Sequence, residues 1–269
     1  MPKVNLDDFT IVSYDILSGF NSNGDLLFEA EELTDVTISN AEETSDVTGK
    51  LGRILMRLKR NKSTTVSGTN GLLVGGLLAT QVGDEVNKGT YNVRYRDVVT
   101  VNNNTAVTTY QAEGAAGTEI GVVYVRVDGA STNIIDCKKL TQVAETPATG
   151  QFQYTPDSKT LTFFADDIED GTQVLVYYDV AVDGYSIANR SDQYSDTVEC
   201  TIDVTCQDTC NNRFHGQFLF RRADFSGAFD LTGGTDPTTH PFEFTTLPDV
   251  CNENDDLWEF YIFGEYATE

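Results

Sequence analysis

Residues 48–83, TGKLGRILMRLKRNKSTTVSGTNGLLVGGLLATQVG, contain two patterns of apolar residues that decide the fold. The first half of the stretch alternates, with Ile54, Met56 and Leu58 pointing to one side of the chain. A period of two is that of a strand with one buried face, so we expect a half-buried strand over residues 50–62. The side chains that point the other way are Arg53, Leu55, Arg57 and Lys59.

The second half of the stretch changes to a period near four, with Leu77 four residues after Leu73. Thr69 and Asn70 are candidate N-caps, and Gly83 is the residue at which such a helix ends. The stretch therefore predicts one α-helix at about residues 70–82. It is the only convincing helical pattern in the 269 residues.

Short segments rich in β-branched and aromatic residues fill the rest of the chain, separated by turn sequences such as NSNGD at residues 21–25. Their regular spacing predicts a mainly β fold, a barrel or sandwich flanked by the one helix, with extended hairpins or loops. Residues 91–110 are expected to form a long projecting hairpin with an asparagine-rich tip. Strands are expected in 6–20, 90–101, 105–112, 119–127, 134–143, 151–156, 159–165, 172–182, in two segments after Ser195, and in 257–265.

The domain organisation follows from the absence of a Pro- or Ser-rich linker and of a strong internal repeat. We expect one composite domain over residues 1–269. Within it, the strand series from about 118 to 183 is a candidate semi-independent β lobe.

The charge balance is strongly acidic, with 42 acids against 18 bases and a net charge of −24. Nucleic acid and anionic membranes would both be repelled, so general binding to either is disfavoured. The N-terminus has no apolar segment of a secretory signal, and the apolar run 71–79 is less than half the ~20 residues of a membrane span. Five cysteines favour reduced thiols. We expect a soluble protein made in the cytosol, without membrane insertion.

An acidic segment at residues 25–46 is followed at once by the basic segment 50–62. A solvated surface is the plain interpretation of each segment. The alternative is that acids of one copy meet bases of the next across a repeated interface. A nucleic-acid patch is less favoured because stacking aromatics are not interleaved with the bases. The candidate inter-subunit residues are Lys50, Arg53, Arg57, Lys59, Arg60, Lys62, Glu29, Glu31, Glu32, Asp35, Glu42, Glu43, Asp255 and Asp256.

Catalytic chemistry has little support, because only His215 and His240 are present and neither lies in a nucleophile motif. We therefore expect that the protein is not an enzyme and that it binds no cofactor. Metal binding has weak candidates of zinc-ligating types, and buried cysteines with a loop histidine are the favoured interpretation. Those candidates are Cys206, Cys210, His215 and Cys251, with His240 as a more distant addition.

Three stretches, residues 52–83, FHGQFLFRRADFSGAFDLT at 214–232 and LWEFYIFGE at 257–265, resemble the major tail tube protein of tailed bacteriophages. The resemblance implies a β-barrel or sandwich flanked by a single helix. It also implies hexameric rings that stack into an acidic-lined conduit, through which phage DNA is ejected without specific binding. The chain is longer than many tube proteins, which leaves room for an added lobe or extended loops.

The resemblance also implies a place in the virion tail, after synthesis and assembly in the host cytoplasm. Its implied partners are further copies of the chain, the tape measure, the tail terminator, the baseplate or tail tip and, in a contractile tail, the sheath. The alternative functions are another virion component, such as a neck or decoration protein, and a glycan-binding β-sandwich module.

Overall fold

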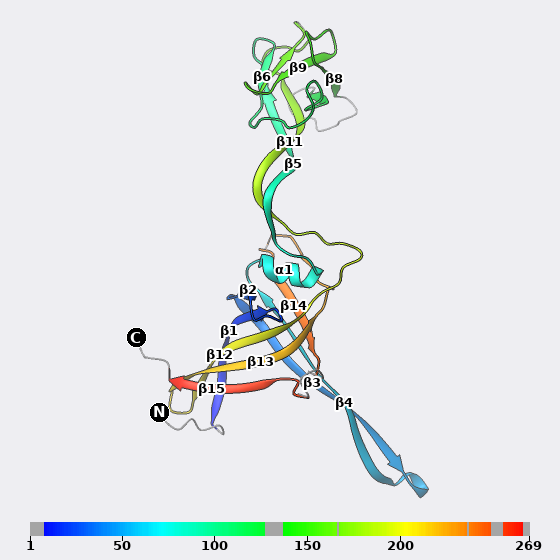
Figure 1. The fold of residues 1–269 in the computed structure, drawn as a ribbon, viewed down its shortest axis with the longest axis vertical. Coiled ribbons are helices and arrows are strands. Elements are labelled where there is room, and N and C mark those ends of the chain that lie inside the picture. Colours follow the sequence, from blue (N-terminus) through cyan, green and yellow to red (C-terminus); the bar gives the residue numbers. More distant parts are fainter. Residues whose placement is uncertain (1–7, 127–136, 166, 236, 249–254, 266–269) are drawn as a thin grey trace. The chain divides into compact units, whose positions relative to one another are not determined.

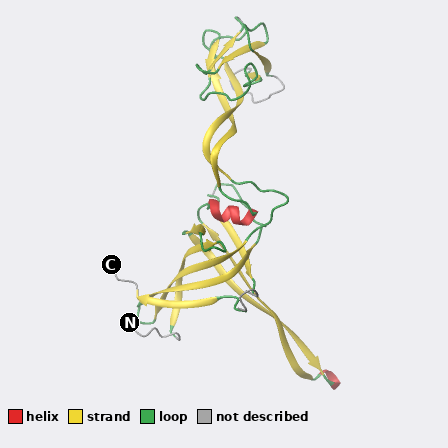
Figure 2. Cartoon of the chain, in the orientation of Figure 1, coloured by secondary structure: helices red, strands yellow, loops and turns green. Residues whose placement is uncertain are grey.

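The computed structural model describes residues 8–126, 137–165, 167–235, 237–248 and 255–265. Strands dominate these residues, which hold a single α-helix and a short 3₁₀ helix, Lys50–Gly52, between β3 and β4 (Figures 1 and 2). This confirms the predicted mainly β class. The chain divides into two compact units. Unit 1 comprises residues 1–87 and 187–269, and unit 2 comprises residues 88–186. Each unit has its own hydrophobic core.

Unit 1 is built on an eight-stranded sheet in the order β2-β1-β12-β13-β14-β4-β3, with β15 paired to β13. The predicted turn at 21–25 joins β1 to β2, and Gly24 has the positive φ of 84° that this turn requires. The closing aromatic segment is held in the sheet as β15, as the sequence predicts. The strands are β1 Phe9–Phe20, β2 Leu26–Ala30, β3 Leu33–Thr48, β4 Ile54–Asn70, β12 Thr197–Asp208, β13 Arg213–Phe225, β14 His240–Thr246 and β15 Glu259–Glu265.

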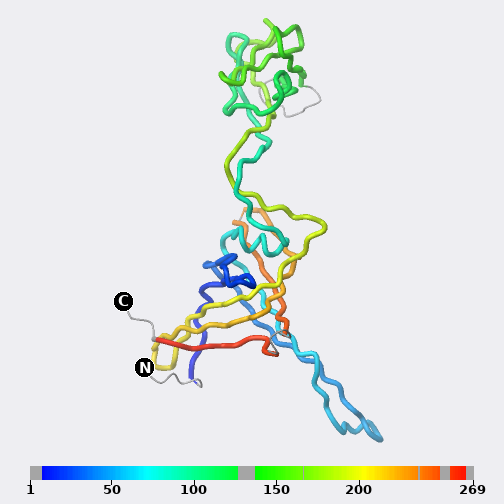
Figure 3. The backbone as a smooth tube through the Cα atoms, viewed as in Figure 1, coloured from blue at the N-terminus to red at the C-terminus, as the bar shows by residue number. Residues whose placement is uncertain are grey.

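The core of unit 1 lies on the inner face of this sheet, which curls around it as a half-barrel (Figure 3). Alternate residues of β12 and β13 point into it and are buried, as expected for strands with one covered face. Phenylalanine rings fill the centre, with the ring of Phe244 5.2 Å from Phe220 and 5.1 Å from Phe225. The helix α1, Gly75–Val82, adds the fully buried Leu77.

The helix ends where the sequence predicts but begins later. Gly83 is the C-cap, with a left-handed φ of 69°. The predicted start near residue 70 is wrong, because Asn70 is the last residue of β4 and the N-cap is Val74. The Asn70 amide accepts a hydrogen bond from the Glu32 N–H and donates one to the Leu72 carbonyl, so it orders the turn before the helix.

Unit 2 is a seven-stranded sheet in the order β5-β11-β7-β8-β9-β10-β6, and the predicted series of short strands is present in the described residues. The predicted long hairpin over residues 91–110 is wrong, because β5 is bonded to β11 and β6 pairs with β10. The strands are β5 Asn87–Thr100, β6 Thr105–Val107, β7 Val122–Val125, β8 Lys138–Val143, β9 Gln151–Thr155, β10 Thr160–Phe163 and β11 Gln173–Ser186.

Two buried tyrosines tie the irregular segment after β6 to the core of unit 2. The Tyr178 hydroxyl donates to Asp97 Oδ2 over 3.0 Å and accepts the Tyr110 N–H over 3.1 Å. The Tyr154 hydroxyl accepts the Ala112 N–H over 2.9 Å. Burial, and secondarily the hydrogen bond to Asp97, raise the pKa of Tyr178 to about 12, so it stays a neutral donor.

Candidate assembly surfaces

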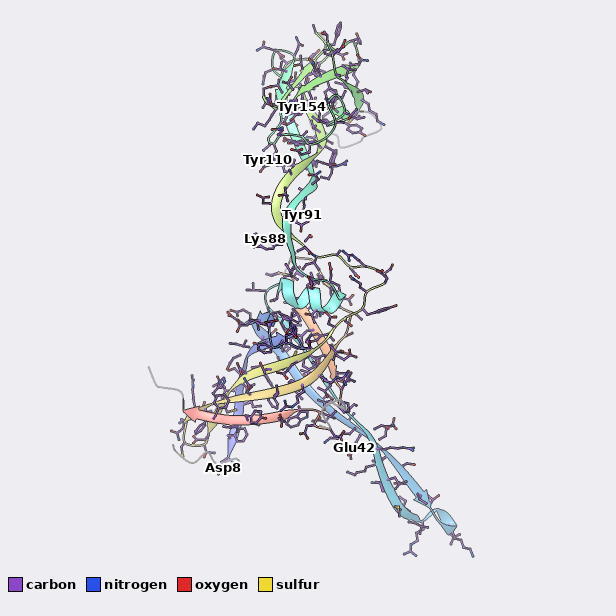
Figure 4. The ribbon with its side chains drawn as sticks, in the orientation of Figure 1. Asp8, Glu42, Lys88, Tyr91, Tyr110 and Tyr154 are labelled. Carbon is purple, nitrogen blue, oxygen red and sulfur yellow. The ribbon has the colours of Figure 1, made fainter. Side chains whose placement is uncertain are left out.

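The outer part of the β3–β4 hairpin, residues 41–62, is here called the arm. It extends beyond the sheet of unit 1, and Glu42 marks its base in Figure 4. The predicted alternation of Ile54, Met56 and Leu58 with basic residues is present. The expectation of a half-buried strand is wrong, because the described residues cover neither face of the arm. Alternation reports which side chains share a face, and another element must still lie against that face to bury it.

One face of the arm is apolar and exposed. Ile54, Met56 and Leu58 are 53%, 58% and 46% exposed, and Val47 lies opposite Met56 in the register. Leu51 sits at the tip, 97% exposed, with a positive φ of 65° that is uncommon outside glycine. A two-stranded hairpin is marginally stable on its own, and clustered exposed apolar side chains mark an interaction site. The arm therefore has the character of an interface element.

The other face of the arm is charged and internally paired. The guanidinium of Arg57 donates from Nε to Asp46 Oδ1 at 2.8 Å and from Nη2 to Oδ2 at 3.1 Å. Lys59 Nζ donates to Glu42 Oε1 at 2.7 Å, and this bond lowers the pKa of Glu42. The acidic and basic segments thus meet within one hairpin. Whether they also meet between copies stays a prediction.

The other predicted contact residues fall in three places. Lys50, Arg53 and Arg60 are exposed on the arm, and the Arg60 backbone lies opposite Glu43. Lys62, Asp255 and Asp256 line a 350 Å³ cavity at the base of the arm, beside Trp258. The remaining four acids are exposed along β2 and the start of β3: Glu29, Glu31, Glu32 and Asp35.

The candidate metal ligands are not brought together. Cys206 is buried on the core face of β12, whereas His215 lies on the opposite face of β13, where its Nε2 is 3.5 Å from Asp203 Oδ1. Cys210 is exposed in the turn between these strands, and Cys251 lies outside the described residues. No group of three potential ligands occurs in the part of the chain that the structure describes. Burial raises the pKa of the Cys206 thiol, which suits a packing role.

The face of β1, β12, β13 and β15 turned away from the core is here called the polar sheet face. Its side chains are linked across strands, with Thr205 Oγ1 donating to Asp15 Oδ2 at 2.7 Å. Gln217 Nε2 donates to Asp203 Oδ1 at 2.8 Å. Its charged residues include Asp15, Glu199, Asp203, Arg213, Arg221, Arg222, Asp224 and Glu259.

Glu259, on the polar sheet face, accepts two side-chain hydrogen bonds. It accepts hydrogen bonds from the Tyr261 hydroxyl at 2.8 Å and from Arg221 Nη2 at 2.6 Å. These two bonds, the tyrosine first, lower the pKa of Glu259 and keep it ionised. Sequence reasoning missed this surface because its members are single polar residues spread over four distant strands.

Among the described residues, no helix has the length and apolar character needed to cross a membrane. A family model described as the YomU/Tube protein family matches residues 13–258, which reach into both units. No curated protein matches the chain.

Proposed function

The chain belongs to the YomU/Tube protein family, a phage tube-like family of structural proteins, and on this premise we propose that it is the major tail tube subunit. Copies assemble into rings of six, and the rings stack into a tube that conducts phage DNA. The role is structural, and the site of action is the tail of the virion. Family membership makes the chain a tube-related structural protein of a phage tail.

The observation that carries the proposal is the uncovered apolar face of the arm. Ile54, Met56 and Leu58 gain free energy only if a partner removes them from water, at roughly 25 cal/mol for each Å² buried. In a homopolymer another copy of the chain is always available as that partner. We assign the arm to the contact between neighbouring copies, most simply across stacked rings.

The polar sheet face is the proposed lining of the channel. Its acids outnumber its arginines by two, counting Asp15, Glu199, Asp203, Asp224 and Glu259 against Arg213, Arg221 and Arg222. A lining rich in Lys or Arg would bind phosphates and retain the genome, whereas a mildly acidic one lets the duplex slide. DNA then passes without specific binding.

The same proposal places other tail proteins around the tube. The tape measure fits the lumen during assembly, the terminator closes one end, and the baseplate or tail tip closes the other. A sheath would surround the tube in a contractile tail. None of these contacts requires membrane insertion or a cofactor.

Sedimentation velocity of the purified chain tests the proposal. We expect species much heavier than the 29.6 kDa chain, shifting to smaller ones when salt is raised, because screening weakens charge pairs between copies. Serine substitutions of Ile54, Met56 and Leu58 should leave only the monomer. A wild-type chain that remains monomeric at high concentration would contradict the proposal.

A further inference from the structure

The outer face of the unit 2 sheet carries cations beside tyrosines. Arg94 pairs with Asp179 across β5 and β11, which places these two side chains on one face. Successive side chains of a strand alternate, so Arg96, two residues after Arg94, and Tyr177, two residues before Asp179, share that face. Both are exposed, Tyr177 by 36%.

The same face continues over β7 and β8. Leu175 of β11 lies opposite Tyr124 of β7, and Tyr124 lies opposite Lys139 of β8. The Lys139 ammonium is 5.6 Å from the centre of the Tyr124 ring, a cation–π distance. Arg126, two residues beyond Tyr124, donates to Gln173 Oε1 at 3.0 Å. The tyrosine–cation patch is therefore Arg94, Arg96, Arg126, Lys139, Tyr124 and Tyr177.

This patch is unusual for its setting. The chain has a net charge of −24, yet Asp179 is the one acid that pairs with a patch cation in the described residues. Within those residues the Arg96 side chain makes no hydrogen bond or ion pair, and the Lys139 ammonium lies over the Tyr124 ring without an ion-pair partner. Tyrosine and arginine are the residues enriched where protein interfaces are centred. The patch is suited to an acidic protein surface.

A matching surface lies at the end of the unit 1 sheet. β2 is the terminal strand there, and its Leu26 and Leu27 are exposed. Glu29, Glu31 and Glu32 follow and are exposed, and no described base forms an ion pair with any of the three. This acidic corner, residues 26–32, presents two leucines beside three carboxylates. It complements a patch of two tyrosines beside arginine and lysine in both polarity and charge.

We propose that the tyrosine–cation patch of one copy binds the acidic corner of another copy in the assembled tube. The inference rests on the proposed tube function and adds the role of unit 2, which is to cross-link neighbours. A chain with this net charge repels its own copies, so assembly needs places where opposite charges meet. The tyrosines and leucines supply apolar contact within the same interface.

Two charge-reversed variants of the full chain test the proposal. Arg96→Glu with Lys139→Glu makes the patch acidic, and Glu29→Lys with Glu31→Lys makes the corner basic. Each alone should raise the critical concentration for assembly by roughly tenfold, because like charges then face each other in every contact. An equal mixture should assemble as the wild type does, because each reversed surface then meets its complement on the other variant.

Lys88→Glu with Lys159→Glu is the matched control, since it reverses two cations of unit 2 outside the patch. It should leave the critical concentration within about twofold of the wild type. Circular dichroism checks that each variant folds. If the charge-reversed patch variant does not fold, Arg96→Gln with Lys139→Gln takes its place, and it should raise the critical concentration for assembly roughly threefold.

Three outcomes would overturn the inference while leaving the tube function intact. The reversed variants could assemble as the wild type does, or their mixture could fail to recover. The patch variant could also assemble normally but lose affinity for heparin, which would identify the patch as a polyanion site. A wild-type chain that never assembles would overturn the tube function itself, and this interface with it.

Discussion

The Nδ1 atom of His240 accepts a 3.2 Å hydrogen bond from the backbone N–H of Val74, the residue that caps α1. The Nε2–H of the same ring donates to Gln81 Oε1 at 2.8 Å, and Gln81 Nε2 donates to the Pro241 carbonyl at 2.9 Å. Because Nδ1 is an acceptor here, the imidazole is neutral. One fully buried side chain thus links β14 to both ends of the helix.

Protonation of His240 should destabilise unit 1. Burial lowers the pKa of His240. Its hydrogen-bond partners Val74 and Gln81 carry no charge that could offset a cation, and Glu243 and Asp236 are the nearest acids along the chain. The folded state therefore favours the neutral ring. The contribution of His240 to the free energy of unfolding is fully present above about pH 6.5, the pKa of a histidine in the unfolded chain. It is lost as the pH falls below that value.

Urea unfolding at pH 7.5 and pH 5.5 checks this prediction. His240→Gln removes the titrating group and should cost about 1–3 kcal/mol at pH 7.5, because polar groups at α1 lose a partner. The free energy of unfolding should fall more between the two pH values in the wild type than in the variant. Equal falls would show that other groups account for the acid sensitivity.

The two glycines that begin α1 should respond oppositely to alanine. A Cβ on Gly76 would lie 2.2 Å from the Leu27 carbonyl oxygen, so Gly76→Ala forces the helix away from β2 and should cost about 1–3 kcal/mol. A Cβ on Gly75 meets nothing closer than 3.9 Å. Gly75→Ala should therefore be neutral or stabilise by up to about 1 kcal/mol through helix propensity. Thermal unfolding of both variants measures this, and equal effects would contradict the close packing of α1 on β2.

Truncation of the apolar arm face should separate assembly from folding. Ile54→Ser, Met56→Ser and Leu58→Ser together remove side chains that the described chain leaves in water, so the monomer should lose little stability. Assembly, followed by light scattering, should be abolished. Val107→Ser, at a similarly exposed valine of β6, is the control and should assemble normally. Tubes formed by the triple variant would show that the apolar face of the arm is not needed for assembly.

Charge reversal on the other arm face should also impair assembly. Arg57→Glu with Lys59→Glu places new carboxylates beside Asp46 and Glu42, so the hairpin loses both of its ion pairs. The monomer should stay folded, because the core of unit 1 includes none of these residues. Adding Asp46→Arg and Glu42→Lys restores both pairs in reverse and separates hairpin order from contact with another copy. Recovery of assembly would assign the charges to hairpin order, and continued failure to a contact between copies.

Local patterns were sufficient to predict most of the strands. β-branched and aromatic runs with turn residues between them gave β9, β10 and β11 within a residue or two on the N-terminal side, and Gly83 correctly marked the end of α1. The start of α1 could not be read in the same way. Its N-cap residue, Val74, makes no side-chain capping bond and is held through its N–H by His240, 166 residues away, and no local sequence signal encodes such a partner.

The surfaces were harder to predict than the strands. Apolar and charged side chains alternate along the arm as they do along any amphipathic strand. This pattern does not indicate whether another element covers the apolar side. The cations of the tyrosine–cation patch, Arg94, Arg96, Arg126 and Lys139, lie on β5, on β8 and directly after the end of β7. Their proximity depends on the order β5-β11-β7-β8, which is a property of the tertiary fold.

The central claim is that copies of this chain form a tube, and negative-stain electron microscopy of the purified wild-type protein tests it most directly. The account predicts rings and stacked tubes of uniform diameter with a central channel, dispersing as salt is raised. A field of monodisperse single particles at high protein concentration would contradict it.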